Sequence, residues 1–141
     1  MESNTSIAPG LQSQPSAIIH FIQRMDIEMV NDILTDGRTY QDKDKSVFIH
    51  KLGIAFEKFI ENGDTFLDCY KGFCNVKDCN FNCSGYSFIG NHTHNYLDMV
   101  FIIQDEMVHD LYECGGFKIS QPGIEKKERI YIDKFEWIKP F

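Results

Sequence analysis

The sequence has few of the features that mark a nucleic-acid-binding or membrane protein. Its 141 residues carry 14 Lys and Arg against 21 Asp and Glu, a formal net charge of −7 at pH 7. Nucleic acids and anionic lipid surfaces are bound by clustered basic side chains, so this charge argues against both partners. Apolar runs also stay shorter than the roughly 20 residues that a membrane-spanning helix needs. We therefore expect no nucleic-acid partner and no membrane partner.

The first 15 residues lack the basic start and the apolar run of a secretory signal. They are rich in Ser, Gln and Asn, so we predict a disordered tail over 1–15 and a single domain over 16–141. A chain of this length buries about two-thirds of its unfolded surface in one core. Without export we expect a cytoplasmic protein, in which the five cysteines are reduced thiols or metal ligands rather than disulfides.

Motifs of the common catalytic sites are also missing. There is no glycine-rich phosphate loop after a strand, no Gly-x-Ser-x-Gly elbow and no His-Glu-x-x-His. A catalytic site would therefore have to be assembled from residues that are far apart in the sequence.

Two helical patterns open the domain. In the first, apolar residues recur at three- and four-residue steps from Ile18 to Ile33, and Asp26 interrupts them. This predicts either one bent helix or two helices in tandem, with Ser16 as the N-cap and Asp36-Gly37 as the end. The second pattern is a stronger amphipathic helix over 47–60, capped by Asp44 or Ser46.

The rest of the chain is predicted to form strands, and the last two of these are predicted to pair as an antiparallel hairpin. A further segment, 128–138, alternates in part and predicts a strand, although the charged run 125–129 can equally begin a helix. The four predicted strands are Thr65–Lys71, Tyr86–Ile89, Tyr96–Ile103 and Met107–Cys114.

This order of helices followed by consecutive strands is typical of α+β folds. Over about Ser16 to Cys114 the chain resembles the nuclear transport factor 2-like superfamily, the cystatin-like group that includes polyketide cyclases and ketosteroid isomerase. The residues that carry the resemblance are Met25-Asp26, Asp32-Ile33-Leu34, Tyr40, the turn Asp44–Ser46, the helix Phe48–Phe59 and the hairpin Tyr96–Tyr112.

The resemblance implies a cone-shaped, curved antiparallel sheet that wraps the long helix, with one or two helices before it. It also implies a ligand pocket at the open end of the cone, and homodimers formed through the outer face of the sheet. Because the pocket would be rich in aromatic side chains, we expect a small apolar ligand. The predicted pocket residues are Tyr40, Phe56, Tyr86, Asp98 and Tyr112. A cysteine-bearing loop, Gly72–Ser84, is not a general feature of the family, so no family activity is carried over.

That loop has the cysteine density of a thiolate metal site. Zinc takes four Cys or His ligands, and Cys74, Cys79 and Cys83 lie within ten residues. The fourth ligand would be Cys114, Cys69, His92 or His94, with Cys114 as the tentative choice. The spacing is not the common C-x2-C pair, and buried free thiols or a redox pair explain the same residues. We expect no resident cofactor, with zinc as the metal that this loop would hold.

Three residues are candidates for catalysis. Asp98 lies in an apolar strand, where it shares a face with Tyr96 and Val100. If that face lines the cone, Asp98 is a desolvated carboxylate suited to moving a proton; on the other face it makes a salt bridge. His94 and Tyr86 are the other two candidates.

Three functions follow from these observations. The first is a small-ligand-binding or homodimerising domain with a pocket between sheet and helices. The second is an isomerase-, cyclase- or dehydratase-type enzyme that uses Asp98 with a Tyr or His. The third is a metal or redox module built on the cysteine loop. The first explains the aromatic content and the missing motifs, and whether the chain is an enzyme stays open.

Overall fold

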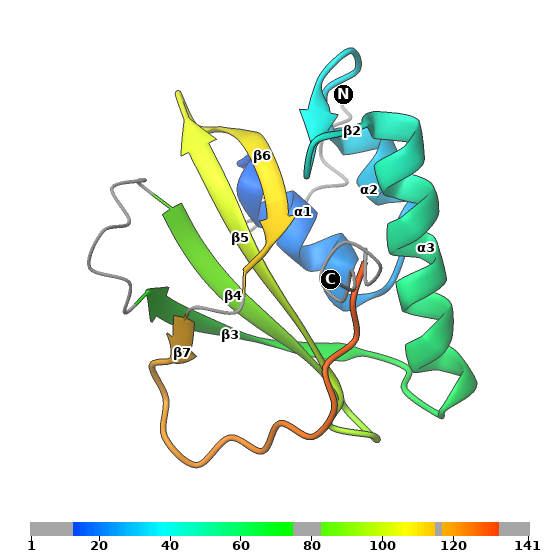
Figure 1. Ribbon diagram of the computed structural model, residues 1–141, viewed down its shortest axis with the longest axis vertical. Coiled ribbons are helices and arrows are strands. Elements are labelled where there is room, and N and C mark those ends of the chain that lie inside the picture. The colour runs from blue at the N-terminus through cyan, green and yellow to red at the C-terminus, as the bar shows by residue number, and fades with distance from the viewer. Residues whose placement is uncertain (1–12, 75–82, 115–116, 133–141) are drawn as a thin grey trace, which may run out of the picture.

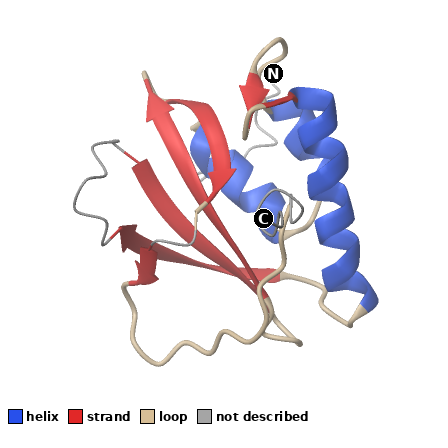
Figure 2. Cartoon of the chain, viewed as in Figure 1, coloured by secondary structure: helices blue, strands red, loops and turns tan. Residues whose placement is uncertain are grey.

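The computed structural model describes residues 13–74, 83–114 and 117–132, which form three helices, a five-stranded antiparallel sheet and a small two-stranded sheet (Figure 1). The helices lie on one side of a curved, open sheet (Figure 2). This confirms the α+β prediction. The predicted tail over 1–15 lies largely outside the described residues, and the first helix already begins at Gln14.

The N-terminal pattern forms two helices in tandem, α1 (Gln14–Gln23) and α2 (Ile27–Ile33). Ser13 caps α1, because its hydroxyl accepts a hydrogen bond from the backbone N–H of Ser16 at 3.2 Å. The prediction that Ser16 is the cap is therefore wrong by one helical turn. Asp26 caps α2 and accepts a hydrogen bond from the Met29 N–H, also at 3.2 Å.

A tight hairpin leads into the long helix α3 (Lys45–Glu61). The hairpin consists of β1 (Thr39–Tyr40) and β2 (Lys43–Asp44), and Asp44 is the residue that precedes the first turn of α3. Gly63, with φ +103°, follows the end of the helix in a conformation that favours glycine. One side of α3 is buried through Phe48, Leu52, Ala55, Phe56 and Phe59, as the apolar spacing predicts.

The large sheet has the strand order β6-β5-β4-β3-β7, with every neighbouring pair antiparallel. The predicted hairpin is confirmed as β5 and β6, which are joined at Asp105-Glu106. The predicted strand over 128–138 is limited to a parallel bridge between Arg129 and Tyr96, and 133–138 lies outside the described residues. The strands are β3 (Leu67–Cys74), β4 (Cys83–Gly90), β5 (Tyr96–Gln104), β6 (Met107–Glu113) and β7 (Phe117–Ile119).

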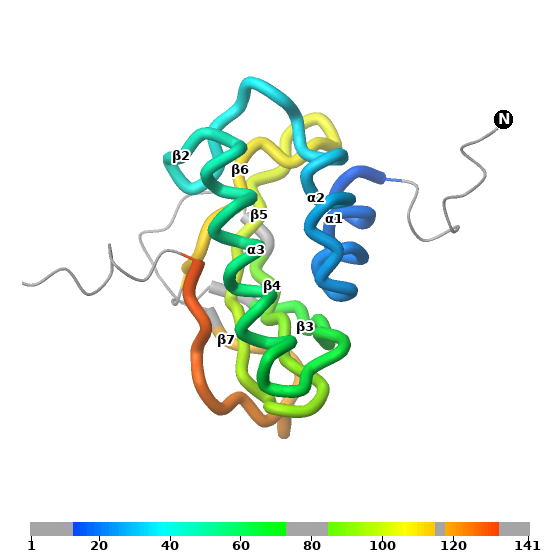
Figure 3. The backbone as a smooth tube through the Cα atoms, turned by 90° about the vertical axis from the view of Figure 1, so that its right-hand side faces the viewer, coloured from blue at the N-terminus to red at the C-terminus, as the bar shows by residue number. Residues whose placement is uncertain are grey.

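The hydrophobic core lies between the helices and one face of this sheet. Figure 3 shows α3 in front of the strands, with α1 and α2 to one side. On β5 the side chains of Leu97, Met99 and Phe101 belong to the core. Since neighbouring side chains on a strand point to opposite faces, Asp98 and Val100 lie on the face away from the helices.

Asp64, between α3 and β3, fixes the turn between β4 and β5. Its carboxylate is 2% exposed and accepts three hydrogen bonds: from the His92 N–H at 2.7 Å, the Thr93 N–H at 2.8 Å and the Thr93 hydroxyl at 2.7 Å. A Cβ atom on Gly90 would collide with this carboxylate, so the close approach requires glycine. The carboxylate thus joins the end of α3 to the far end of β4.

Replacing Asp64 by Ala should lower the free energy of unfolding by about 1–3 kcal/mol, because three part-buried donors at His92 and Thr93 lose their acceptor. Urea unfolding followed by circular dichroism measures this loss. Asp68→Ala is the matched control, since Asp68 is exposed on β3 and should change stability by less than about 0.5 kcal/mol. Equal effects of the two substitutions would contradict the anchoring role of Asp64.

Candidate functional site

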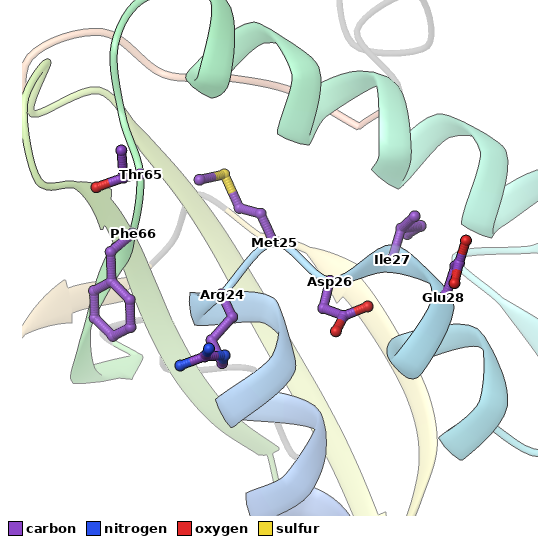
Figure 4. Close-up of a pocket in the computed structure, with 7 residues that line it drawn as sticks. All are labelled: Arg24, Met25, Asp26, Ile27, Glu28, Thr65 and Phe66. Carbon is purple, nitrogen blue, oxygen red and sulfur yellow. The ribbon is translucent and has the colours of Figure 1, made fainter.

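A cleft of about 480 Å³ lies where α1 meets α2, facing the start of β3 (Figure 4). It is therefore bounded by helices on one side and by the sheet on the other. The residues that line it are Arg24, Met25, Asp26, Ile27, Glu28, Thr65 and Phe66.

The backbone at Met25 makes this cleft. Met25 has φ +55°, in the left-handed region that side chains other than glycine rarely adopt. The chain turns there because the Met25 N–H donates to the Ile22 carbonyl, and the Asp26 N–H to the Phe21 carbonyl, both at 2.9 Å. The Met25 side chain is buried in the core, which holds the turn in place.

A side chain near the end of α1 also ties the helix to the sheet on the opposite side of the cleft. The Gln23 amide donates to the carbonyl of Leu67 on β3 at 3.1 Å. The two walls of the cleft are thus joined by a hydrogen bond as well as by the core. Such a connection keeps a binding site in shape before a ligand arrives.

The cleft combines charged and apolar side chains. Arg24 and Glu28 are exposed, whereas Asp26, Ile27 and Phe66 are half-buried. Figure 4 shows Arg24 directed toward Phe66, with the carboxylates of Asp26 and Glu28 on the other side. An apolar surface with separated charges of both signs suits a small ligand that has an apolar body and a polar end.

No sequence pattern marks these residues as a site. Arg24, Glu28, Thr65 and Phe66 look individually like ordinary surface residues, and no motif connects them. The one signal was Asp26, which breaks the apolar periodicity and therefore predicted the junction between the helices. That the junction also faces β3 follows from the tertiary fold.

A second cleft, of about 420 Å³, lies before the first turn of α3. Within it Lys45 donates to Asp36 at 2.6 Å and to the Leu34 carbonyl at 2.8 Å. The hydrogen bond and the positive charge of Lys45 lower the pKa of Asp36. This cleft already contains a matched ion pair. Its lining residues are Asn31, Asp36, Gly37, Arg38, Asp44, Lys45 and Ser46.

The structure does not bring the five predicted pocket residues together. Tyr40 and Phe56 are in the core, and the Tyr40 hydroxyl accepts a hydrogen bond from the Thr35 N–H at 3.1 Å. Tyr86 contacts Phe101 edge to face, with ring centroids 5.3 Å apart. Asp98 lies on the opposite face of the sheet, and so does Tyr112, which is paired with Val100 across the β5–β6 ladder. Neither of the two clefts is lined by any of the five.

Asp98 forms a buried cluster with Ser87 and Lys126. It is 3% exposed, and it accepts hydrogen bonds from the Ser87 hydroxyl at 2.5 Å and from the Lys126 ammonium at 3.1 Å. Lys126 also donates to the Ser87 hydroxyl at 3.2 Å and lies 4.3 Å from the centre of the Tyr96 ring. Asp98 therefore lies on the face away from the helices and makes a salt bridge, as expected if it does not line the cone.

The other two catalytic candidates lie elsewhere. His94 is in the turn between β4 and β5, with φ +63°, and its Nδ1 is 3.8 Å from a Glu125 carboxylate oxygen. Tyr86 lies on the core face of β4. The three candidates therefore occupy a turn, one face of the sheet and the opposite face.

The tentative zinc site falls mostly outside the described residues. Cys79 is outside them, and the side chains of Cys74 and Cys83 are not described either; Cys114 is a partly buried free thiol. Within 13–74, 83–114 and 117–132 no group of three or more His, Cys, Asp or Glu could hold a metal ion. Over the same part of the chain, no helix has both the length and the apolar character to cross a membrane.

Lys126→Gln should lower the free energy of unfolding by about 3 kcal/mol, because it leaves the Asp98 carboxylate buried without its cation. Thermal or urea unfolding tests this, and the exposed neighbour allows a matched control, Lys127→Gln, that should have little effect. If the two lysine variants were equally stable, the buried ion pair would not hold the C-terminal segment to the sheet.

Burial raises the pKa of Cys69 to about 12, so this thiol stays protonated at pH 8. Since the thiolate is the nucleophile, iodoacetamide should modify Cys69 in the native protein at least about tenfold more slowly than in urea. Mass spectrometry of the peptide containing Cys69 follows the reaction. Similar rates in the folded and unfolded protein would show that the thiol is accessible and ionised.

Comparisons of the chain with protein-family models, with curated proteins and with solved structures found no match.

Proposed function

We propose that this protein is a non-catalytic binding domain that takes a small ligand in the cleft between α1, α2 and β3. The observation that carries the proposal is the cleft itself, which lies between the helices and the sheet and is built around the backbone of Met25. Its volume of about 480 Å³ is in the range of small-molecule sites, roughly 300–1,000 Å³.

The conformation of Met25 supports this choice of site. Positive φ values at residues other than glycine are costly, and they are enriched where a fold builds a functional feature. The other such residues in the described structure are Gln41, Asp42, His94, Asp105 and Glu106, which all occupy turns between strands. Met25 instead joins two helices and has a buried side chain. The strained residue therefore shapes the cleft wall rather than a hairpin.

The side chains of the cleft favour a ligand with an apolar body and a cationic group. Phe66 and Ile27 offer apolar surface for the body of the ligand. Asp26 and Glu28 contribute two carboxylates, while Arg24 is directed to the other side (Figure 4). A primary amine attached to a small aromatic or aliphatic body matches this arrangement. The proposed ligand therefore has an amino group in addition to the small apolar body that the sequence predicts.

The enzyme alternative has less support. Isomerase-, cyclase- or dehydratase-type chemistry needs an acid and a base in one dry cavity. Asp98 is paired with Lys126 and Ser87 on the face away from the helices, whereas Tyr86 lies on the core face and His94 lies in the turn between β4 and β5. A binding role needs no such pair.

The finer predictions stay part of this proposal. They are the cone-shaped nuclear transport factor 2-like arrangement, the homodimer, the cytoplasmic location and the expectation of no resident cofactor, with zinc in the cysteine loop as the alternative. The curved open sheet with helices on one side is compatible with the cone-shaped arrangement. Sedimentation analysis tests the dimer, and zinc quantification in the purified protein tests the loop.

Phenethylamine is a suitable probe, since it joins an aromatic ring to an ammonium group. Titration followed by backbone-amide NMR should shift the signals of 24–28 and 65–66 saturably, whereas benzoate, with the opposite charge, should bind more weakly. Glu28→Gln should weaken phenethylamine binding about two- to fivefold, the value of one exposed charge contact. Glu57→Gln, which removes an exposed carboxylate from α3, is the matched control.

Shifts that cluster elsewhere, or that do not saturate, would refute the cleft as the binding site. An equal affinity of the parent protein and Glu28→Gln would refute the assigned ligand chemistry.

A further inference from the structure

A row of charged and aromatic side chains follows the C-terminal segment (residues 124–132) past the start of β5. The Tyr96 N–H donates to the Glu128 carbonyl at 2.9 Å, and the Ile130 N–H donates to the Tyr96 carbonyl at 2.7 Å. These bonds place Arg129 beside Tyr96 in a parallel bridge. In Figure 1 this segment runs past the lower end of the sheet and then turns up toward the C-terminus.

Two of the cations in this segment, Lys126 and Arg129, differ in how their polar atoms are satisfied. Lys126 has the Asp98 carboxylate, the Ser87 hydroxyl and the face of the Tyr96 ring as partners. The Arg129 guanidinium carbon lies 4.8 Å from the centre of the Tyr131 ring. Its Nε and Nη2 atoms are buried and have no hydrogen-bond partner among the described residues.

An arginine cannot escape this situation by losing its proton, because the guanidinium group keeps its positive charge in proteins. Contact with an aromatic ring satisfies the charge in part but leaves the N–H groups unbonded. Buried donors of a charged group without an acceptor are costly, so native proteins rarely retain them without a ligand, ion or water. The unbonded nitrogens of Arg129 are therefore an informative feature.

The two unbonded nitrogens, Nε and Nη2, are a pair with which an arginine can bind one anion through two hydrogen bonds. Nε and Nη2 lie on the same edge of the planar guanidinium, and their N–H bonds point in the same direction. This edge binds two oxygens of a carboxylate or a phosphate at once. We propose that the Nε–Nη2 edge of Arg129, beside Tyr96 and Tyr131, is an oxyanion-binding site for a ligand that presents a carboxylate or phosphate group.

The surroundings fit such a ligand. Asp98, the buried carboxylate on the same face of β5 as Tyr96, is already engaged by Lys126 and Ser87, so it does not compete for Arg129. Burial and the negative charge of Asp98 raise the pKa of Tyr96, so its hydroxyl stays protonated and able to donate. Because Nε and Nη2 are buried, the oxyanion reaches them only when the covering side chains move. Binding should therefore also change the environment of the neighbouring aromatic rings.

This site is separate from the proposed cleft. Neither Arg129 nor its aromatic neighbours line the cleft at Met25. The two proposals can therefore fail independently.

The chain has three arginines, Arg24, Arg38 and Arg129, so their Nε–H groups give three signals in a proton–nitrogen correlation spectrum. Replacing each arginine in turn by Lys assigns them. Sodium phosphate and sodium acetate are then titrated separately into the full-length protein, with chloride used to hold the ionic strength constant. We expect one or both anions to shift the Arg129 signal saturably, and the preferred anion identifies the ligand group.

Arg129→Lys keeps the charge but removes the two-donor edge, so it should weaken binding roughly tenfold, as followed by the ring signals of Tyr96 and Tyr131. Arg38→Lys, which alters an arginine outside this row, should not change the affinity. If Arg129→Lys does not fold, assignment from the other two variants leaves the titration of the parent protein decisive. Unsaturable shifts, equal shifts of all three arginines, or undiminished binding by Arg129→Lys would overturn the proposal.

Discussion

The arrangement of this protein depends on the burial of both faces of β5. One face supplies Leu97, Met99 and Phe101 to the core beneath the helices. The other face carries Asp98 and Val100, each 3% exposed. A carboxylate so deeply buried needs a cation and hydrogen bonds, because its solvation by water is lost. Lys126 and Ser87 meet that need, and the same ion pair fixes the C-terminal segment against the sheet.

The ion pair between Lys126 and Asp98 also affects the position of the residues that follow Lys126 in the segment 124–132. With Lys126 held at Asp98, the following residues bond to the free side of β5 at Tyr96, where β6 has ended. Ile130 and Ile132 can then reach the core, and the Ile132 N–H donates to the buried carboxylate of Glu113 at 2.7 Å. Arg129 lies between Glu128 and Ile130, which both bond to Tyr96, and is placed beside Tyr96 and Tyr131. Its buried Nε and Nη2 atoms have no acceptor within residues 13–74, 83–114 and 117–132.

Sequence patterns predicted structure that depends on near neighbours in the chain better than structure that depends on long-range contacts. Local patterns succeeded for α3 and for the β5–β6 hairpin, because the apolar spacing and the tight turn act between near neighbours in the chain. The α1 cap was placed at Ser16 rather than Ser13, since several serines near the helix start compete for the same N–H groups. None of the five predicted pocket residues lines the cleft at Met25. Both sets of alternate positions on β5 contain large apolar residues, so periodicity cannot tell which set faces the helices.

The sequence by itself determined the α+β class, the break at Asp26, the long helix and the face that Asp98 shares with Tyr96 and Val100. Each of these follows from side-chain spacing or from capping within one element. The tertiary structure alone decided which face of the sheet the helices cover, that Lys126 is the partner of Asp98, and that Met25 faces β3 across a cleft. These features join residues 28 to about 40 positions apart, and chain connectivity does not fix their distance until the core has formed.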